Sequence, residues 1–381
     1  MKNAWLTRTL TRTLTRTLTR TLTRRQAIAA YGSLLAASPL SVQELRAQEP
    51  IGEPPGPIPP GLIPPVQELV NAAEFEAVAR RKLDSPTFTE IAGSERGAFD
   101  RITFRPRLMI DSRQMDLTTG LFGQSLFTPV LIGPLSRQKR FHPEGELATA
   151  RGASAARAVM VVADRSSYPI DQIAAQAKTP LWYQVNLEPD INDAEPDINQ
   201  VRTRVERAVG AGCTVLCVTV GGETSRSPLT AGIDWSAIDR LRKGIAVPVV
   251  LKGVMSPEEA RKAVAGGVEG IVVSGYAARS IPGVASPIEM LPSIADAVGG
   301  KVPILIDGSF RLGSDVLKAL ALGARAVLLG RPVLWGLAAY GAEGVQSVIE
   351  LIQSGFARDM AMCGQVSVKS LDRTVVKIHR R

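Results

Sequence analysis

The stretch VPILIDGSFRLGSDVLKALALGARAVLLGRP, residues 302–332, sets the fold class of the chain. It contains an apolar run at 303–308, a helical pattern at 312–324 and a second apolar run at 326–331, with a glycine turn after each run. Glycine lets backbone N–H groups approach an anion, and guanidinium groups bind phosphate bidentately. Because both runs end in a basic loop, the stretch predicts a β-α-β unit whose strand ends hold a phosphate.

The same alternation of apolar runs and helical patterns extends back to residue 130. The runs are almost continuously apolar and rich in Val and Ile, as expected of strands buried on both faces. The predicted strands are 130–133, 159–164, 181–186, 214–220, 248–254, 270–275, 303–308 and 326–331, and the helical patterns are 145–158, 169–177, 197–212, 234–245, 256–267, 287–300 and 312–324. Eight units in roughly 220 residues predict a (β/α)8 barrel. An open doubly wound sheet is the alternative, but the first strand leads into GPLSRQ rather than a glycine-rich fingerprint.

The residues before the barrel divide into three parts. Residues 1–47 combine TRTL repeats, the pair Arg24-Arg25 and a short apolar run, which is the order of regions in a twin-arginine signal peptide. Residues 48–65 are rich in proline and predict an extended linker. Residues 66–381 predict the barrel domain with an N-terminal helical extension, starting with a helix at 66–83 and a strand at 101–110. We expect export to the periplasm and no stable membrane span after signal removal.

The charge and the metal-binding residue types exclude two classes of function. The net charge is +9, but residues 1–47 hold eight Lys and Arg against one Glu, so the rest of the chain carries about +2. The excess of basic residues therefore lies almost entirely in residues 1–47, and we expect no nucleic-acid partner. With two histidines and three cysteines in the whole chain, we expect no metal site.

Polar and basic side chains gather where the predicted strands end. In a (β/α)8 barrel the active site lies at the C-terminal ends of the strands. The candidates there are Gly133, Pro134, Leu135, Ser136, Ala163, Asp164, Gln184, Asn186, Thr219, Lys252, Ser274, Gly275, Tyr276, Asp307, Gly308, Gly330 and Arg331, with Arg279 and Arg311 shortly after their strands. The last two strand ends, with their glycines and arginines, predict the phosphate site. Lys252 ends an otherwise apolar strand, so it either points into the barrel mouth at a ligand, which we expect, or extends outward to solvent.

Several motifs resemble a known family. They are FRPR (104–107), HPEGE (142–146), LKGV (251–254), VVSG-x-x-AR (272–279), DGS-x-R (307–311), KALALGARAVLLGRP (318–332) and FARDMAMCG (356–364). Over about residues 70–375 the chain is similar to the FMN-dependent α-hydroxy-acid oxidases and dehydrogenases, which include glycolate oxidase, lactate oxidase and mandelate dehydrogenase. The resemblance implies a (β/α)8 barrel with FMN at the strand ends and a small carboxylate substrate. It also implies a possible homo-oligomer.

The resemblance implies a role for most of the candidates. Pro134, Leu135 and Ser136 would face the flavin ring, Gln184, Thr219 and Ser274 would lie against it, and Lys252 would stand near N1 and O2, where its charge favours reduction. Asp307 would contact the ribityl chain. Gly308, Arg311, Gly330 and Arg331 would hold the phosphate, and Arg279 the substrate carboxylate.

The catalytic residues of that family are replaced here. Tyr276 stands in place of the family's histidine, Asn186 in place of a tyrosine, and Gly221 in place of the aspartate that supports the histidine. Histidine has an ordinary pKa near 6.5 and tyrosine near 10, so tyrosine is less suited to act as a base. Tyr276 either serves as proton donor or acceptor, with its pKa depressed by Lys252 or Arg279, or it only shapes the substrate pocket. Loss of general-base catalysis typically costs ~10²–10⁴-fold in rate.

Three functions fit this sequence. The first is an exported FMN-dependent oxidoreductase that passes electrons from a small carboxylate to flavin N5, with Tyr276, Lys252 and Arg279 as catalytic residues. The second is a non-catalytic or chemically repurposed FMN-binding barrel. The third, a barrel isomerase without flavin, explains the phosphate loops but not Lys252 and Arg279 together.

Overall fold

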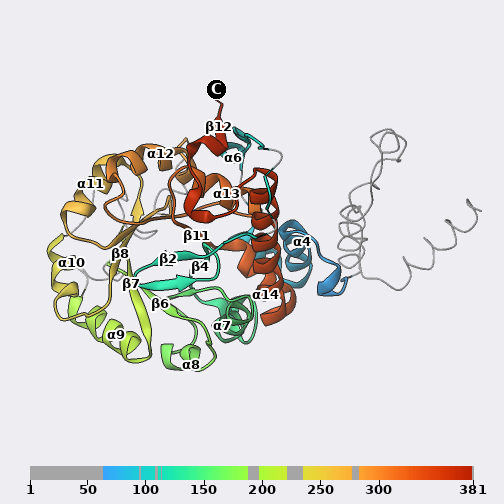
Figure 1. Ribbon diagram of the computed structural model, residues 1–381. Helices are drawn as coiled ribbons and strands as arrows, with labels where there is room; N and C mark the ends of the chain where they lie inside the picture. The colour runs from blue at the N-terminus through green and yellow to red at the C-terminus, as the bar shows by residue number, and fades with distance from the viewer. Residues whose placement is uncertain are drawn as a thin grey trace, which may run out of the picture.

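The predicted strands close into one parallel barrel (Figure 1). The structure is a computed structural model, and it describes residues 63–93, 96–107, 110–112, 114–187, 197–220, 235–276 and 283–379. The barrel strands follow each other in the order β10-β11-β4-β5-β6-β7-β8-β9. Their bounds are Val130–Leu135 (β4), Met160–Ala163 (β5), Leu181–Asn186 (β6), Cys213–Thr219 (β7), Val249–Val254 (β8), Gly270–Val273 (β9), Ile304–Asp307 (β10) and Ala326–Leu329 (β11). The (β/α)8 prediction is confirmed.

A helix follows each barrel strand and packs on the outside of the barrel (Figure 1). The helices are Gly145–Ala155 (α7), Ile170–Ala174 (α8), Ile198–Gly210 (α9), Trp235–Arg242 (α10), Pro257–Ala265 (α11), Pro287–Val298 (α12), Gly313–Ala321 (α13) and Arg331–Met362 (α14). Their apolar stripes explain this placement: α9, for example, buries Val201, Val205 and Ala208 on one face and exposes charged residues on the other. None of the described helices is both long and apolar enough to cross a membrane.

The last helix, α14, is bent where Tyr340 and Gly341 leave helical geometry. The bend lets the two halves of the helix touch, because a Cβ built on Gly336 would lie 2.4 Å from the carbonyl oxygen of Gly344. The first half contains Trp335, which is fully buried. The sequence pattern did not predict α14, because its apolar residues occur on all sides rather than in one stripe.

The N-terminal extension differs from the predicted helix at 66–83. A 3-10 turn at Val66–Glu68 (η1) is separated from the helix Ala72–Lys82 (α4) by an extended Leu69. The Asn71 side chain accepts a hydrogen bond from the backbone N–H of Glu74 and begins the helix there. Helices Ser85–Ile91 (α5) and Gly97–Asp100 (α6) follow. The prediction of a single helix is therefore wrong in its first six residues.

The strand predicted at 101–110 is much shorter in the structure. Only Ile102–Phe104 (β1) forms a strand, paired antiparallel with Val376–Ile378 (β12), and residues 108 and 109 lie outside the described residues. Pro106 cannot donate a backbone hydrogen bond, which ends the pairing. The pair lies outside the barrel and joins the two ends of the domain.

A hairpin closes the N-terminal end of the barrel. Strands Thr119–Leu121 (β2) and Gln124–Leu126 (β3) are joined by Phe122 and Gly123, both with positive φ. The Phe122 ring packs edge-on against Trp182 inside the barrel, with ring centroids 5.4 Å apart. The Phe122 and Trp182 side chains therefore help to fill this end of the barrel.

Candidate cofactor and substrate site

The ends of β8, β9 and β10 carry a buried ion pair at the barrel mouth. Lys252 is 3% exposed, and its Nζ lies 2.7 Å from Asp307 Oδ2 and 2.7 Å from Ser274 Oγ. The β8–β9 register shifts between Lys252 and Val254, where Gly253 has a φ of 115°. A Cβ at Gly253 would lie 2.4 Å from the carbonyl oxygen of Val220, so only glycine fits this close approach. Lys252 therefore points into the barrel.

Tyr276 lies beside this ion pair. Lys252 Nζ is 5.4 Å from the centroid of the Tyr276 ring, within the range of a cation–π contact, and 38% of Tyr276 is exposed. The aromatic face thus points at the ammonium group. Arg279 belongs to residues 277–282 and Gly221 to residues 221–234, both outside the described residues.

The ends of β5, β6 and β7 form a neutral and acidic side. Gln184 and Thr219 are both 4% exposed, and Gln184 Nε2 donates to Thr219 Oγ1 at 2.9 Å. Gln184 Nε2 also donates to Asn186 Oδ1 at 3.1 Å, and Asn186 Nδ2 donates to Asp164 Oδ1 at 3.2 Å. Burial raises the pKa of Asp164, while hydrogen bonding to Asn186 and the charge of Arg204 lower it. Asn186 and Asp164 were not among the predicted cofactor-binding residues.

The segment with Pro134, Leu135 and Ser136 ends β4 and is tied to the next loop. Gln138 Nε2 donates to the Leu135 carbonyl oxygen at 3.0 Å. The buried Glu146 accepts the backbone N–H groups of Gln138 and Ser167, each at 2.9 Å from Oε1. One carboxylate therefore fixes the loops after both β4 and β5.

The predicted phosphate residues converge after β10 and β11. Gly308 has a φ of 104°, which favours glycine. The Arg311 guanidinium stacks 5.1 Å from the Trp335 ring, and Arg331 Nη1 donates to the Ala92 carbonyl oxygen at 3.2 Å. Burial lowers the pKa of Arg311, and the charges of Arg331 and Arg96 lower it further, against the opposing effect of Glu76. Two partly buried guanidiniums that follow neighbouring strands suit a bound anion.

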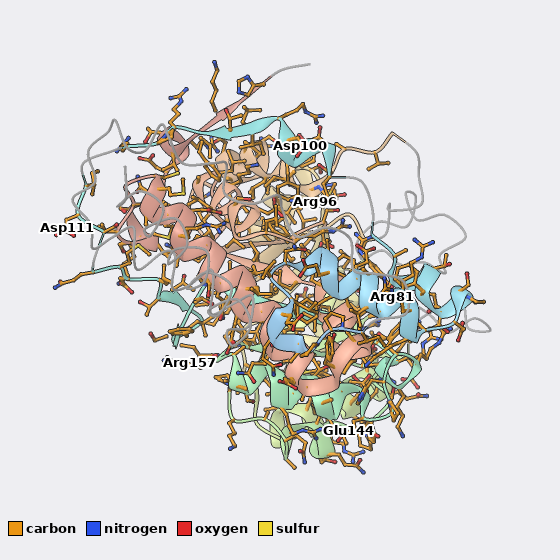
Figure 2. The ribbon with its side chains drawn as sticks, turned by 90° about the vertical axis from the view of Figure 1, so that its right-hand side faces the viewer. Arg81, Arg96, Asp100, Asp111, Glu144 and Arg157 are labelled. Carbon is orange, nitrogen blue, oxygen red and sulfur yellow. The ribbon has the colours of Figure 1, made fainter. Side chains whose placement is uncertain are left out.

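A third guanidinium, Arg96, was missed by the sequence analysis. It comes from the N-terminal extension, and Figure 2 shows it on the side of the molecule that also carries Asp100, well away from Glu144. Its Nη2 forms an ion pair with both oxygens of Asp315, and its Nε donates to the Ser309 carbonyl oxygen at 3.4 Å. Asp315 is 1% exposed and accepts the backbone N–H groups of Arg311 and Leu312, each at 2.9 Å. No local motif signals this pair, because its members are 219 positions apart.

The residues present fit FMN. The glycine turn and guanidiniums after β10 and β11 suit a phosphate, Asp307 suits a sugar-alcohol chain, and the buried amide, hydroxyl and ammonium groups suit a polar ring edge. No group of His, Cys, Asp and Glu among the described residues could hold a metal ion. The fold and the site together define a flavin-binding (β/α)8 barrel.

Comparison with known proteins assigns the family. The family model of the FMN-dependent dehydrogenases matches residues 83–225 and 221–378. A peroxisomal (S)-2-hydroxy-acid oxidase of Oryza sativa subsp. japonica is 33% identical over 356 residues, covering 81% of this chain and 95% of the relative. An L-lactate oxidase of Nostoc sp. is 33% identical over 365 residues, covering 81% and 98%. A crystal structure of mandelate oxidase with 3,3-difluoro-2-hydroxy-3-phenylpropionic acid has a TM-score of 0.74 at 34% identity, covering 82% and 100%. The chain belongs to the FMN-dependent dehydrogenase family, and its cofactor is FMN.

Proposed function

We propose that the protein oxidises a small 2-hydroxy carboxylic acid with FMN as the electron acceptor. The observation that carries the proposal is the buried Lys252, held at the barrel mouth by Asp307 and Ser274. The relatives support the substrate class, because they are named as oxidases of 2-hydroxy acids and of L-lactate. Bound FMN supplies the chemistry, since it accepts two electrons from the substrate.

The residues of the barrel mouth would bind and orient both molecules. Gly308, Arg311, Gly330 and Arg331 would hold the phosphate, and Asp307 the ribityl hydroxyls. Pro134, Leu135, Ser136, Gln184, Thr219 and Ser274 would line the ring, with Lys252 providing a positive charge at its edge. Arg279, outside the described residues, is proposed to hold the substrate carboxylate.

The test is to load the purified protein with FMN and mix it anaerobically with glycolate, lactate and mandelate. We expect a yellow protein with about one FMN per chain, and bleaching of the flavin by at least one of these acids. FMN uptake without bleaching by any 2-hydroxy acid would favour a binding protein without turnover. A protein that takes up no FMN would contradict the proposal itself.

The Tyr276→Phe variant tests the role of the residue that replaces the histidine. We propose that Tyr276 shapes the pocket and does not act as the base, because tyrosine ordinarily titrates near pH 10. Its ring lies under the Lys252 ammonium group, with 5.4 Å between Nζ and the ring centroid. The rate of flavin bleaching should then fall less than about tenfold, whereas loss of a general base costs ~10²–10⁴-fold. The control is Tyr168→Phe, a half-buried tyrosine whose ring lies 4.1 Å from Lys139 Nζ and whose hydroxyl donates to the Pro143 carbonyl oxygen at 3.1 Å. A loss of a hundredfold or more confined to Tyr276→Phe would assign the proton transfer to its hydroxyl.

We also propose export through the twin-arginine pathway. The support is the Arg24-Arg25 pair before an apolar run in residues 1–47, which lie outside the described residues. A protein that carries a tightly bound cofactor has to fold before export, so this route suits a flavoprotein. Fractionation of cells that express the wild type and an Arg24→Lys, Arg25→Lys variant should find only the wild type outside the cytoplasm. The homo-oligomer stays a prediction.

A further inference from the structure

A continuous chain of side-chain hydrogen bonds crosses three neighbouring strand ends. It starts at Asp164 after β5, whose two oxygens accept from Asn186 Nδ2 at 3.2 Å and from the Asn186 backbone N–H at 3.4 Å. Asn186 Oδ1 accepts from Gln184 Nε2 at 3.1 Å, and the same nitrogen donates to Thr219 Oγ1 at 2.9 Å. The chain therefore runs from a carboxylate to the buried wall of the barrel mouth.

The carboxylate at one end determines the direction of every bond in the chain. An ionised carboxylate only accepts hydrogen bonds, whereas an amide has one accepting and one donating end of nearly the same shape. Asn186 must therefore turn its NH₂ group to Asp164 and its carbonyl oxygen to Gln184. Gln184 must then donate to Asn186 with its NH₂ group, which leaves the Gln184 carbonyl oxygen, Oε1, to accept from a ligand. Within the described part of the chain, no residue donates a hydrogen bond to this oxygen.

The free groups at the far end match one feature of a flavin. Gln184 Oε1 is an acceptor, and the Thr219 hydroxyl, which accepts from Gln184, keeps its own hydrogen to donate. An acceptor and a donor side by side recognise an N–H group beside a carbonyl. The pyrimidine part of the flavin ring carries one such imide, an N–H between two carbonyls.

We propose that Asp164 is a positioning residue that fixes the direction of this chain, so that Gln184 presents a hydrogen-bond acceptor to the imide N–H of the flavin. The inference rests on the proposed FMN-dependent function. The proposed role is particular to this protein, because Asn186, which links Asp164 to Gln184, stands where the resemblance implies a tyrosine in the family. Asp164 itself makes no contact with the ring in this proposal and acts through Asn186.

Protonation of Asp164 should allow the Asn186 and Gln184 amides to adopt either orientation. A protonated carboxyl gains an O–H donor and can then face the carbonyl end of Asn186, which allows both amides to turn over. Burial raises the pKa of Asp164, and the charges of Arg204 and Arg165 oppose the rise. Tyr183 also faces Asp164, and burial raises its pKa to about 12, so it stays neutral and does not compete. The orientation of both amides is thus fixed above the pKa of Asp164 and lost as the pH falls through it.

The test measures the dissociation constant of FMN by flavin fluorescence across the acidic and neutral range, in the wild type, Asp164→Asn and Asp171→Asn. Asp171 lies on α8 and forms an exposed ion pair with Arg207, so its variant shares every other pH effect, including titration of the FMN phosphate. At neutral pH we expect Asp164→Asn to bind FMN about tenfold more weakly, the factor that one directed hydrogen bond contributes. The loss of FMN affinity in Asp164→Asn, measured against Asp171→Asn, should become smaller as the pH falls. The reason is that the carboxyl of Asp164 then becomes protonated where it is present.

A second probe tests whether Gln184 presents its carbonyl oxygen to the imide N–H. FMN methylated at the imide nitrogen has no N–H to donate, so the wild type should prefer FMN over this analogue more strongly than Asp164→Asn does. If Asp164→Asn does not fold, Asn186→Ala breaks the same chain and should show the same loss of preference. Equal affinities, pH profiles and analogue preferences in Asp164→Asn and Asp171→Asn, with FMN still bound, would overturn the inference and leave the proposed function intact. Failure of the wild type to bind FMN would overturn both.

Discussion

The Lys252→Met variant is expected to unfold with a free energy about 3 kcal/mol below that of the wild type. Its affinity for FMN should fall roughly 10- to 100-fold, because a hydrogen bond to a charged group contributes about 1.5–3 kcal/mol. The Lys252 side chain is 4% exposed, and the Asp307 side chain that it pairs with at 2.7 Å is 22% exposed. Removing one partner of a buried pair leaves the other charge without compensation, at a cost of roughly 3–5 kcal/mol. The partial exposure of Asp307 places the expected value at the lower end.

Urea denaturation of the FMN-free protein separates the stability term from the loss of cofactor binding. The control is Lys369→Met, since Lys369 is 69% exposed and pairs with Asp116 at 3.5 Å on the surface. Such a pair contributes about 0–1 kcal/mol. The double variant Lys252→Met, Asp307→Asn should recover much of the stability, because it removes the stranded charge, but not the FMN affinity. If Lys252→Met matched Lys369→Met in both measurements, the ion pair would have no role at the barrel mouth.

The barrel could be predicted from the sequence because its strands are buried on both faces and read as continuous apolar runs. Residues at the strand ends, such as Lys252 and Gln184, could be placed from the topology alone, since all parallel strands finish at one end of a barrel. Elements with weaker local signals were missed. The hairpin β2–β3 has strands of three residues, and its turn uses Phe122 at a φ of 50°. Helix α14 lacks an amphipathic stripe.

The missed parts of the site depend on contacts between distant segments. Arg96 precedes a short helix in the N-terminal extension, and nothing around it in the sequence points to Asp315. Asp164 and Asn186 were placed at the strand ends without a role, because the role of Asn186 requires Asp164 and Gln184 on either side of it in space. The positions where the resemblance predicts replaced residues, such as Asn186 and Tyr276, are thus where the structure adds most to the sequence.

The second large effect is expected for Arg96→Ala, which should lower the free energy of unfolding by about 3 kcal/mol near neutral pH. Asp315 is 1% exposed, and Arg96 supplies its counter-charge. In the variant, Asp315 would still accept hydrogen bonds from the backbone N–H groups of Arg311 and Leu312 at the start of α13. These bonds stabilise the carboxylate and limit the loss of folding stability. Arg101→Ala is the matched control, because Arg101 lies on the same segment as Arg96 and forms a more exposed ion pair, with Glu289 of α12. Its loss should stay within about 1 kcal/mol.

The pH dependence distinguishes a stranded carboxylate from a loss of packing. Burial raises the pKa of Asp315 above its ordinary value of 3.8, and the Arg96 charge opposes the rise. A carboxyl whose pKa is raised by folding binds more protons in the folded state, so its contribution to stability falls as the pH rises from 3.8 through the folded-state pKa. Without Arg96 the pKa of Asp315 rises further, so the pH range over which its contribution to stability falls extends to higher pH. The cost of Arg96→Ala should therefore be smallest in acid and largest above the new pKa, and urea denaturation between about pH 5 and about pH 8 measures it. Adding Asp315→Asn should abolish the pH dependence of the cost, whereas a cost independent of pH in Arg96→Ala itself would show that packing, and not the buried charge, is what Arg96 contributes.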